Sequence, residues 1–222
     1  MAYSPLTIEF EFRNQRFQSA QRGLEYLARD LGEQYAKLGP IMKARMQWFL
    51  RGVAEALAQA HGTPWKEGTT EKTLSRRSGK AVRSIRNSVR VTGDKPENIE
   101  GRIGGIFYLR THEFGATIKA KRATYLTIPT EYALNPDGTP IRPNARSWPN
   151  TFVAKSKKGN LIIFQRQPDK SIIPLYVLKK EVKIPARLGM GLRLKQNVAY
   201  FVDKVSDDML KALRGDKVTV LA

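Results

Sequence analysis

The spacing of apolar residues predicts helices at the start of the chain. Apolar side chains recur every three or four positions between residues 17 and 38, which is the spacing of one helix face. Asn14 is expected to be the N-cap of this helix, and Gly39-Pro40 is expected to end it. Pro40 suits the first turn of a second helix, which extends to Gly62 and is apolar on more than one face. Such a helix is buried from several sides, either by its own domain or by a neighbouring copy of the chain.

A strand-like pattern begins at residues 8–12, where apolar and acidic side chains alternate. This strand is short, so we expect it to pair with a distant segment or with another subunit. Further short apolar runs between residues 89 and 177 also predict strands, and turn signals separate them. These signals are Gly93-Asp94, Asn135-Pro136-Asp137-Gly138 and Lys158-Gly159-Asn160. Residues 130–150 hold four prolines and are expected to form an exposed arm or lid.

Helical spacing returns near the C-terminus, from Val198 to a stop at Gly215, and strand-like Val218 and Val220 follow. The sequence therefore predicts an α+β fold. It has N-terminal helices, a central antiparallel β-sheet with hairpins and a long excursion, and a C-terminal helix packed on the sheet.

The composition adds a size and a charge distribution to this picture. The chain has 222 residues, of which 41% are hydrophobic, enough for the core of one large or two small domains. Its net charge of +19 is uneven: residues 1–62 contribute +2 and residues 63–222 contribute +17. We therefore divide the chain into an N-terminal strand and helical segment, 1–62, and a basic α+β domain, 63–222. A polyanion is the first partner that such a charge suggests.

The most specific basic feature is residues 72–90, which contain seven basic side chains and no acidic one. Plotted as a helix, this segment places Leu74, Val82 and Ile85 on one side and most of its cations on the other. Such a face can neutralise DNA phosphates, contact an acidic protein surface, or remain solvated. The candidate DNA or partner contacts are Arg76, Arg77, Lys80, Arg83, Arg86 and Arg90.

Residues suited to catalysis are sparse. The chain has no cysteine and only two histidines, which leaves little material for a metal site. His112-Glu113 is a candidate acid–base pair, but neighbours on a strand point to opposite faces, and no second histidine is nearby in the sequence. The serines of residues 75–88 lack an adjacent base, and the glycines of residues 101–105 match no phosphate-binding motif. We therefore predict a protein that is not an enzyme and that has no cofactor and no metal.

Four segments in order carry a resemblance to a known family. They are Arg77-Ser78-Gly79 with Ser84-Ile85, the YLRTHEFGATI run 108–118, the YLTIP run 125–129, and the IPAR run 184–187. This arrangement resembles the virion morphogenesis proteins of tailed bacteriophages, which are tail-completion, neck or head–tail joining proteins. The resemblance covers about residues 65–213, roughly two thirds of the chain. Phe114-Gly115 is expected to end a strand with a buried ring. The structural motif residues are His112, Phe114, Gly115, Pro129, Pro185 and Arg187.

The resemblance implies a structural virion protein at the head–tail junction or the head-proximal end of the tail. The chain would be one subunit of a homo-oligomeric ring, acting as a stopper, a tail terminator or a completion factor. Its partners would be other neck, connector or tail-tube proteins, with genomic double-stranded DNA in the lumen. The chain would reach the virion after synthesis in the host cytoplasm.

Other classes of function remain open. A non-enzymatic DNA-binding accessory protein is the main alternative, and it rests on the charge of residues 63–222. A toxin or an RNA-binding module is suggested only by the sequence pI of about 10.3. The chain has no run of 18 apolar residues and no signal-peptide pattern at its start, so no membrane partner is expected.

Overall fold

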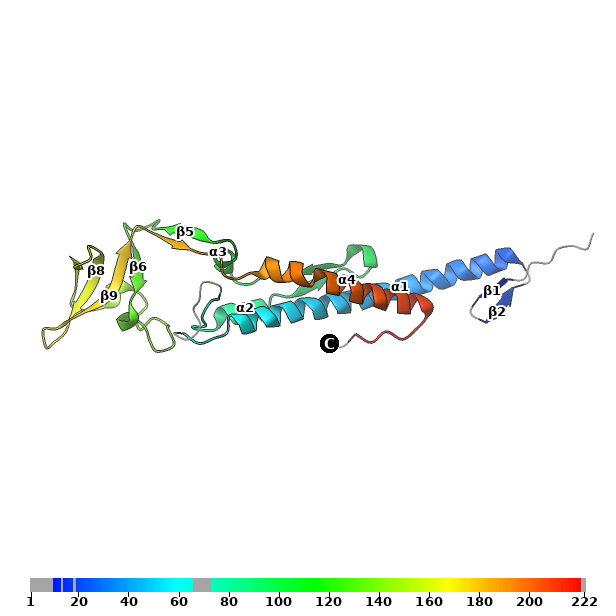
Figure 1. The fold of residues 1–222 in the computed structure, drawn as a ribbon, viewed down its shortest axis with the longest axis horizontal. Helices are drawn as coiled ribbons and strands as arrows, with labels where there is room; N and C mark the ends of the chain where they lie inside the picture. Colours follow the sequence, from blue (N-terminus) through cyan, green and yellow to red (C-terminus); the bar gives the residue numbers. More distant parts are fainter. Residues whose placement is uncertain (1–9, 13, 18, 66–72, 221–222) are drawn as a thin grey trace, which may run out of the picture. The chain divides into compact units, whose positions relative to one another are not determined.

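The computed structural model describes residues 10–12, 14–17, 19–65 and 73–220. It confirms the predicted α+β class, with a long N-terminal helix, antiparallel sheets and a C-terminal helix (Figure 1). The described residues form two compact units that interleave along the sequence. Unit 1 comprises Met1–Leu50, Arg90–Arg102 and Asn197–Ala222, and unit 2 comprises Arg51–Val89 and Ile103–Gln196. The boundary expected after residue 62 falls inside unit 2.

The prediction of two N-terminal helices is wrong, because a single helix α1 runs over Ala20–Ala60 and contains Pro40. A proline inside a helix costs about 3 kcal/mol, since it removes a backbone hydrogen bond and its ring clashes with the preceding turn. Burial on both sides of the proline offsets this cost, because Leu38 and Phe49 are almost fully buried. Gly39 does not stop the helix. It lies directly against the backbone carbonyl of Asp94, where any larger residue would collide.

The N-terminal strand pairs locally, which corrects the expectation of a distant or intermolecular partner. β1 (Phe10–Phe12) forms an antiparallel hairpin with β2 (Gln15–Phe17), while residues 8 and 9 lie outside the described residues. Asn14 is the turn residue of this hairpin, with a left-handed φ of 61°, and not the helix cap that we expected. The cap is Ser19, whose Oγ accepts a hydrogen bond from the backbone N–H of Arg22 at 3.4 Å.

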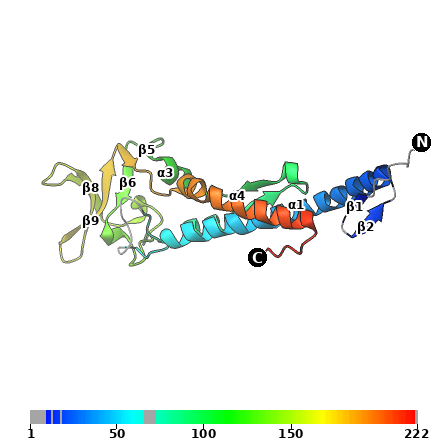
Figure 2. The ribbon, with the colours of Figure 1, turned by 45° about the vertical axis from the view of Figure 1, so that its right-hand side comes forward.

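The core of unit 1 lies between the part of α1 up to Leu50 and the part of helix α4 (Met190–Arg214) that follows residue 196. These two segments run side by side in both ribbon views (Figures 1 and 2). The rings of Phe49 and Phe201 stack at 4.7 Å, and Arg45 forms a buried ion pair with Asp208 at 2.6 Å. The hairpin of β3 (Arg90–Thr92) and β4 (Glu100–Arg102), with the 3₁₀ turn η1 (Pro96–Asn98), packs on α1 through Gly101.

The end of α4 follows the predicted stop signal. Gly215 has a φ of 85°, its N–H donates to the carbonyl of Ala212, and the N–H of Asp216 donates to the carbonyl of Lys211. These are the two bonds of a Schellman motif, which satisfies carbonyls that the helix leaves free. The strand-like tail is a wrong prediction, because residues 216–220 form no strand.

Unit 2 contains the main sheet, in which all strands are antiparallel in the order β6-β9-β8-β7. The strands are β6 (Leu126–Pro129), β7 (Thr151–Lys155), β8 (Leu161–Arg166) and β9 (Ile172–Lys179). The turn predicted at residues 158–160 joins β7 to β8, and the turn predicted at 93–94 joins β3 to β4, so both are confirmed. A bulge next to Phe164 turns Leu175 into the core, where it is fully buried.

The excursion at residues 130–150 is exposed over most of its length, as expected, but it is not a free arm. It folds back on the sheet through two 3₁₀ turns, η2 (Glu131–Ala133) and η3 (Ala145–Ser147). Ala133 is fully buried against Leu175 and Tyr176, and the indole N–H of Trp148 donates to the hydroxyl of Tyr176 at 3.1 Å. The segment therefore covers part of the hydrophobic core of the sheet, while its four prolines are exposed.

Residues 109–114 form a short helix, α3 (Leu109–Phe114), where the sequence predicted a strand. The apolar residues of such a short run fit either period, and the helix buries Leu109 to 4% exposure. After α3 the chain enters β5 (Ala116–Lys119), which pairs antiparallel with β10 (Glu181–Ile184). This two-stranded ribbon brings the His112 segment beside the Arg187 segment.

Candidate functional site: a basic cleft beside two joined segments

The predicted basic helix over residues 72–90 is not continuous. Only Lys80–Arg86 form a helix, α2, because Gly79 stands before it with a left-handed φ of 72°. Val82 and Ile85 are buried as predicted, while Arg76 lies in a backbone bridge with Pro64, and Arg90 lies in strand β3 of unit 1. The six candidate cations therefore do not form one helical face.

Several of these cations already have partners within the chain. Arg86 donates two hydrogen bonds to the carboxylate of Glu55, at 2.7 and 2.8 Å, and these bonds lower the pKa of Glu55. Arg77 stacks on the indole ring of Trp65, with 4.0 Å between the guanidinium carbon and the ring centre. Arg83 donates to the carbonyl of Ser78. These cations of α2 and of the segment before it therefore form contacts within unit 2 itself.

Ser84 and Ser88 connect α2 to the glycine-rich loop through hydrogen bonds. The hydroxyl of Ser84 accepts from the N–H of Ile106 at 3.2 Å, and that of Ser88 accepts from the N–H of Gly104 at 2.9 Å. Both hydroxyls also donate to carbonyls of α2. The glycine-rich loop is thereby held against α2, and neither serine is adjacent to a histidine through these bonds.

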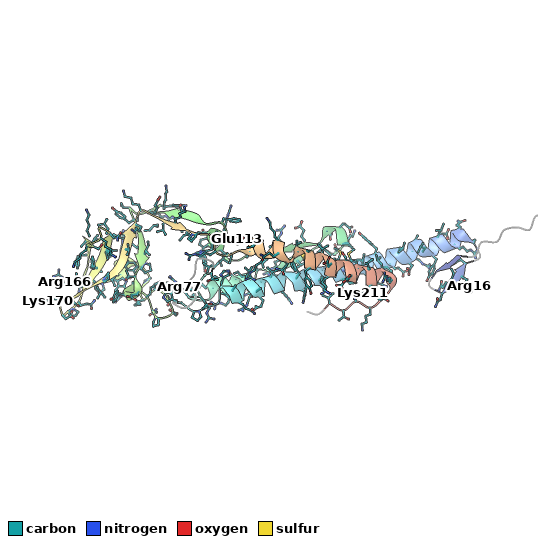
Figure 3. The ribbon with its side chains drawn as sticks, in the orientation of Figure 1. Arg16, Arg77, Glu113, Arg166, Lys170 and Lys211 are labelled. Atoms are coloured by element: carbon teal, nitrogen blue, oxygen red, sulfur yellow. The ribbon has the colours of Figure 1, made fainter. Side chains whose placement is uncertain are left out.

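Two segments that carry the family resemblance are joined in unit 2. The backbone N–H groups of Arg187 and Leu188 both donate to the carbonyl of His112, at 2.6 and 2.9 Å. The carboxylate of Glu113 accepts from the N–H groups of Met190 and Gly191, both at 2.8 Å, at the first turn of α4 (Figure 3). Segments more than 70 residues apart in the sequence therefore form one structural joint.

Gly115 is required at this joint for two reasons. Its φ of 72° is left-handed, and a side chain there would press on the carbonyl of Ile184 and the N–H of Ala186 at about 3.1 and 3.2 Å. Phe114 is not the buried anchor that we expected, because its ring is 75% exposed at the end of α3. Pro129 ends β6 opposite Tyr176, and Pro185 is exposed directly after β10.

A cleft of about 390 Å³ lies beside this joint, entirely within unit 2. One wall is the segment from Leu74 to α2, and the other is α3 with Arg187 and Leu188. The cleft combines basic, aromatic and aliphatic side chains. Among its lining residues are Arg76, Arg77, Lys80, Arg187, Trp65, Tyr108, Leu74, Val82, Leu109, His61 and His112.

The two histidines of the chain meet at this cleft, although no second histidine was expected near His112. His61 is 5% exposed: its Nδ1 accepts from the N–H of Leu74 at 3.1 Å, and its Nε2 donates to the carbonyl of Leu188 at 3.0 Å. This pair of bonds requires the neutral ring, and burial lowers the pKa of His61. His61 thereby links the two walls of the cleft.

His112 and Arg187 carry unsatisfied groups at the cleft. The Nδ1 of His112 and the Nε of Arg187 are both buried without a hydrogen-bond partner among the described residues. Burial, followed by the positive charge of Arg187, lowers the pKa of His112. The carboxylate of Glu113 accepts its two hydrogen bonds from the first turn of α4.

Sequence reasoning missed His61, since it treated His112 as isolated. The only local signal for His61 was its place just before Gly62 at the end of a helix, which does not indicate a partner 127 residues away. Across the described ranges, no group of three or more His, Asp or Glu side chains is placed to hold a metal ion.

Comparisons with known proteins do not extend this description. No protein-family model matches the chain, and neither a curated protein nor a solved structure does. Among the described residues, no helix is both long enough and apolar enough to cross a membrane.

Proposed function

We propose that this chain is a structural subunit of a tailed-bacteriophage virion, which assembles into a ring at the head–tail junction or the head-proximal end of the tail. The observation that carries the proposal is an uncovered apolar stripe on α1. Leu24, Leu31 and Tyr35 are each about half exposed, at 57%, 46% and 47%. At 100° per residue they fall within about 40° of one another on the helix.

A helix segment with such a stripe needs a partner. An isolated helix is marginally stable in water, and a helix gains most of its stability from packing its apolar face. The spacing of seven between Leu24 and Leu31 is the spacing that packs against another helix in coiled coils and bundles. A neighbouring subunit would cover this stripe and supply the missing packing.

Helix α4 also has exposed apolar side chains within unit 1, although they spread around the helix and do not form one stripe. Val198, Tyr200, Val202 and Leu210 are each about half exposed, while Val205 and Ala212 are buried. Apolar side chains thus extend beyond the side of α4 that packs on α1. This pattern fits an element that contacts its own unit on one side and another chain on the other.

The joint between the His112 and Arg187 segments supports a structural role for the residues that carry the family resemblance. Their backbone groups and the carboxylate of Glu113 are used to connect α3, β10 and α4. A motif whose groups form these bonds can be explained by the fold alone, without a catalytic role.

The DNA-binding alternative keeps its main evidence, which is the positive charge of residues 63–222. The continuous cationic helix face expected over residues 72–90 is not formed, however, because Arg86 is paired with Glu55 and Arg90 belongs to the β3–β4 hairpin. The net charge of +19 is still compatible with a lumen that DNA passes through, which is part of the proposed role.

The proposal is tested by deleting the reading frame from the phage or prophage that carries it. We expect full heads and complete tails that do not join, and we expect a copy supplied in trans to restore infectious particles. Normal infectious particles from the deletion would overturn the proposal.

The complementing copy also tests the apolar stripe. The double change Leu24→Glu and Leu31→Glu should fail to complement, because it places charges in the proposed subunit contact. Glu33→Lys, an exposed position on the opposite side of the same helix, should complement normally.

A further inference from the structure

We propose that the cleft in unit 2 between α2 and α3 binds a carboxylate-bearing peptide segment of a partner protein. The inference goes beyond the proposed ring, because it depends only on the lining of this cleft. It would hold equally for a monomeric chain.

The charge of the cleft is the first argument. Arg76, Arg77, Lys80 and Arg187 line it, and no acidic side chain does so among the described residues. None of these four cations forms an ion pair with a described carboxylate. Elsewhere in the chain, cations such as Arg45 and Arg86 do have carboxylate partners. An anionic ligand would compensate this concentration of positive charge.

Buried polar groups without partners, at Arg187 and His112, are the second argument. The Nε of Arg187 is a buried donor without a partner, and the Nδ1 of His112 is a second buried nitrogen without one. Leaving such groups unpaired is costly, so buried polar atoms nearly always have partners. A carboxylate beside Arg187 would bring two acceptor oxygens to this part of the lining.

The shape and the apolar lining favour a peptide. A volume of about 390 Å³ admits a side chain with its neighbours, and Leu74, Val82 and Leu109 would pack against an adjacent apolar group. Trp65, already stacked on Arg77, and Tyr108 add aromatic surface.

The cleft is also held open in advance. His61 binds the backbone of Leu74 on one wall and that of Leu188 on the other. The second wall is further fixed by the bonds from Arg187 and Leu188 to the carbonyl of His112. A ligand therefore does not have to order these walls when it binds, which favours affinity.

The test begins with a library of random dodecapeptides selected on the full-length chain. We expect the selected peptides to be enriched in Asp or Glu next to apolar residues. The strongest binder is then measured by calorimetry as its free acid, as its C-terminal amide, and with each acidic residue changed to its amide. Loss of affinity in one of these forms identifies whether a side-chain or a C-terminal carboxylate enters the cleft.

Variants of the chain then locate the site. Arg187→Met should weaken the peptide by about 10-fold or more, because a charge-assisted bond to a recessed donor is lost. Lys80→Glu, at an exposed position on the rim, should also weaken it and keeps the test valid if Arg187→Met does not fold. Arg122→Met removes an exposed cation outside the cleft and should leave affinity unchanged.

Three results would overturn the proposal. One is a selection with no acidic enrichment, and another is a peptide whose affinity is the same in wild type, Arg187→Met and Lys80→Glu. The third is a labelled single-stranded oligonucleotide that binds in an Arg187-dependent manner while no acidic peptide does, which would assign the cleft to nucleic acid.

Discussion

Glu113 offers the sharpest test of the joint that connects α3 to α4. Its carboxylate accepts two backbone hydrogen bonds at 2.8 Å from the first turn of α4. Replacement by alanine removes both bonds and leaves the N–H groups of Met190 and Gly191 without this acceptor. We therefore expect Glu113→Ala to lower the free energy of unfolding substantially.

The magnitude follows from the two bonds and the helix end. A hydrogen bond to a charged group contributes roughly 1.5–3 kcal/mol, and a negative charge at a helix N-terminus adds about 0.3–1 kcal/mol. Glu113 is partly exposed, so water recovers part of the loss for the freed N–H groups. The expected cost of Glu113→Ala is therefore about 2–4 kcal/mol. Glu113→Gln keeps one acceptor oxygen and should cost about half as much.

The assay is urea unfolding followed by tryptophan fluorescence, together with amide hydrogen exchange at Met190 and Gly191. Both amides should be protected in the wild type and exchange faster in Glu113→Ala. Glu131→Ala is the control, since it removes an exposed carboxylate elsewhere in unit 2 and should change stability by less than about 0.5 kcal/mol. A Glu113→Ala protein with the stability of the control and with unchanged exchange would refute the capping role.

Three further predictions follow from other contacts. Asp208→Ala should lower the free energy of unfolding in urea by about 3–5 kcal/mol, because it leaves Arg45 charged and buried. The double change Arg45→Met with Asp208→Leu should regain most of this stability. A loss below about 1 kcal/mol for Asp208→Ala alone would contradict the buried ion pair. Burial lowers the pKa of His61 and of His112 in the folded chain, so the unfolded chain binds more protons at acidic pH. The free energy of unfolding should therefore fall as the pH drops from 7.5 through about 6.5 to 5. Equal free energies of unfolding at about pH 7.5 and pH 5 would contradict the neutral rings. Phe114→Ala should change stability by less than about 0.5 kcal/mol, since the ring is 75% exposed, and a loss of 3 kcal/mol or more would show that it is an anchor after all.

Local patterns in the sequence predicted much of the secondary structure. The turns at residues 93–94 and 158–160, the stop at Gly215 and the buried side of α2 all follow from residues close together in the chain. Gly215 illustrates the reason, because its left-handed φ and its two capping bonds involve only residues 211–216. Such features depend on local backbone preferences, which a sequence expresses directly.

The wrong predictions share a non-local cause. Pro40 was expected to begin a helix, and only the packing around Leu38 and Phe49 explains why the helix continues through it. The excursion at 130–150 is exposed over most of its length, as its prolines indicated, but its contact with the sheet was not predicted, because Ala133 lies in a core completed by Leu175, 42 residues further along the chain. Tertiary contacts override local propensity in both cases.

The candidate site was predictable only in part. The basic residues 76, 77 and 80 and the His112 and Arg187 segments were singled out from the sequence. That they meet at one cleft depends on the pairing of β5 with β10 and on the bonds of His61, both of which join distant residues. The stripe of Leu24, Leu31 and Tyr35 was visible as a helix face, but its exposure was not.

The ring proposal is tested most directly by counting and locating the chain in purified particles. Quantitative mass spectrometry would give the number of copies per particle, and gold labelling of an epitope-tagged chain would show their position by electron microscopy. The account predicts several copies in each particle, all at the junction of head and tail. Absence from the particle, a single copy, or label spread along the tail would contradict it.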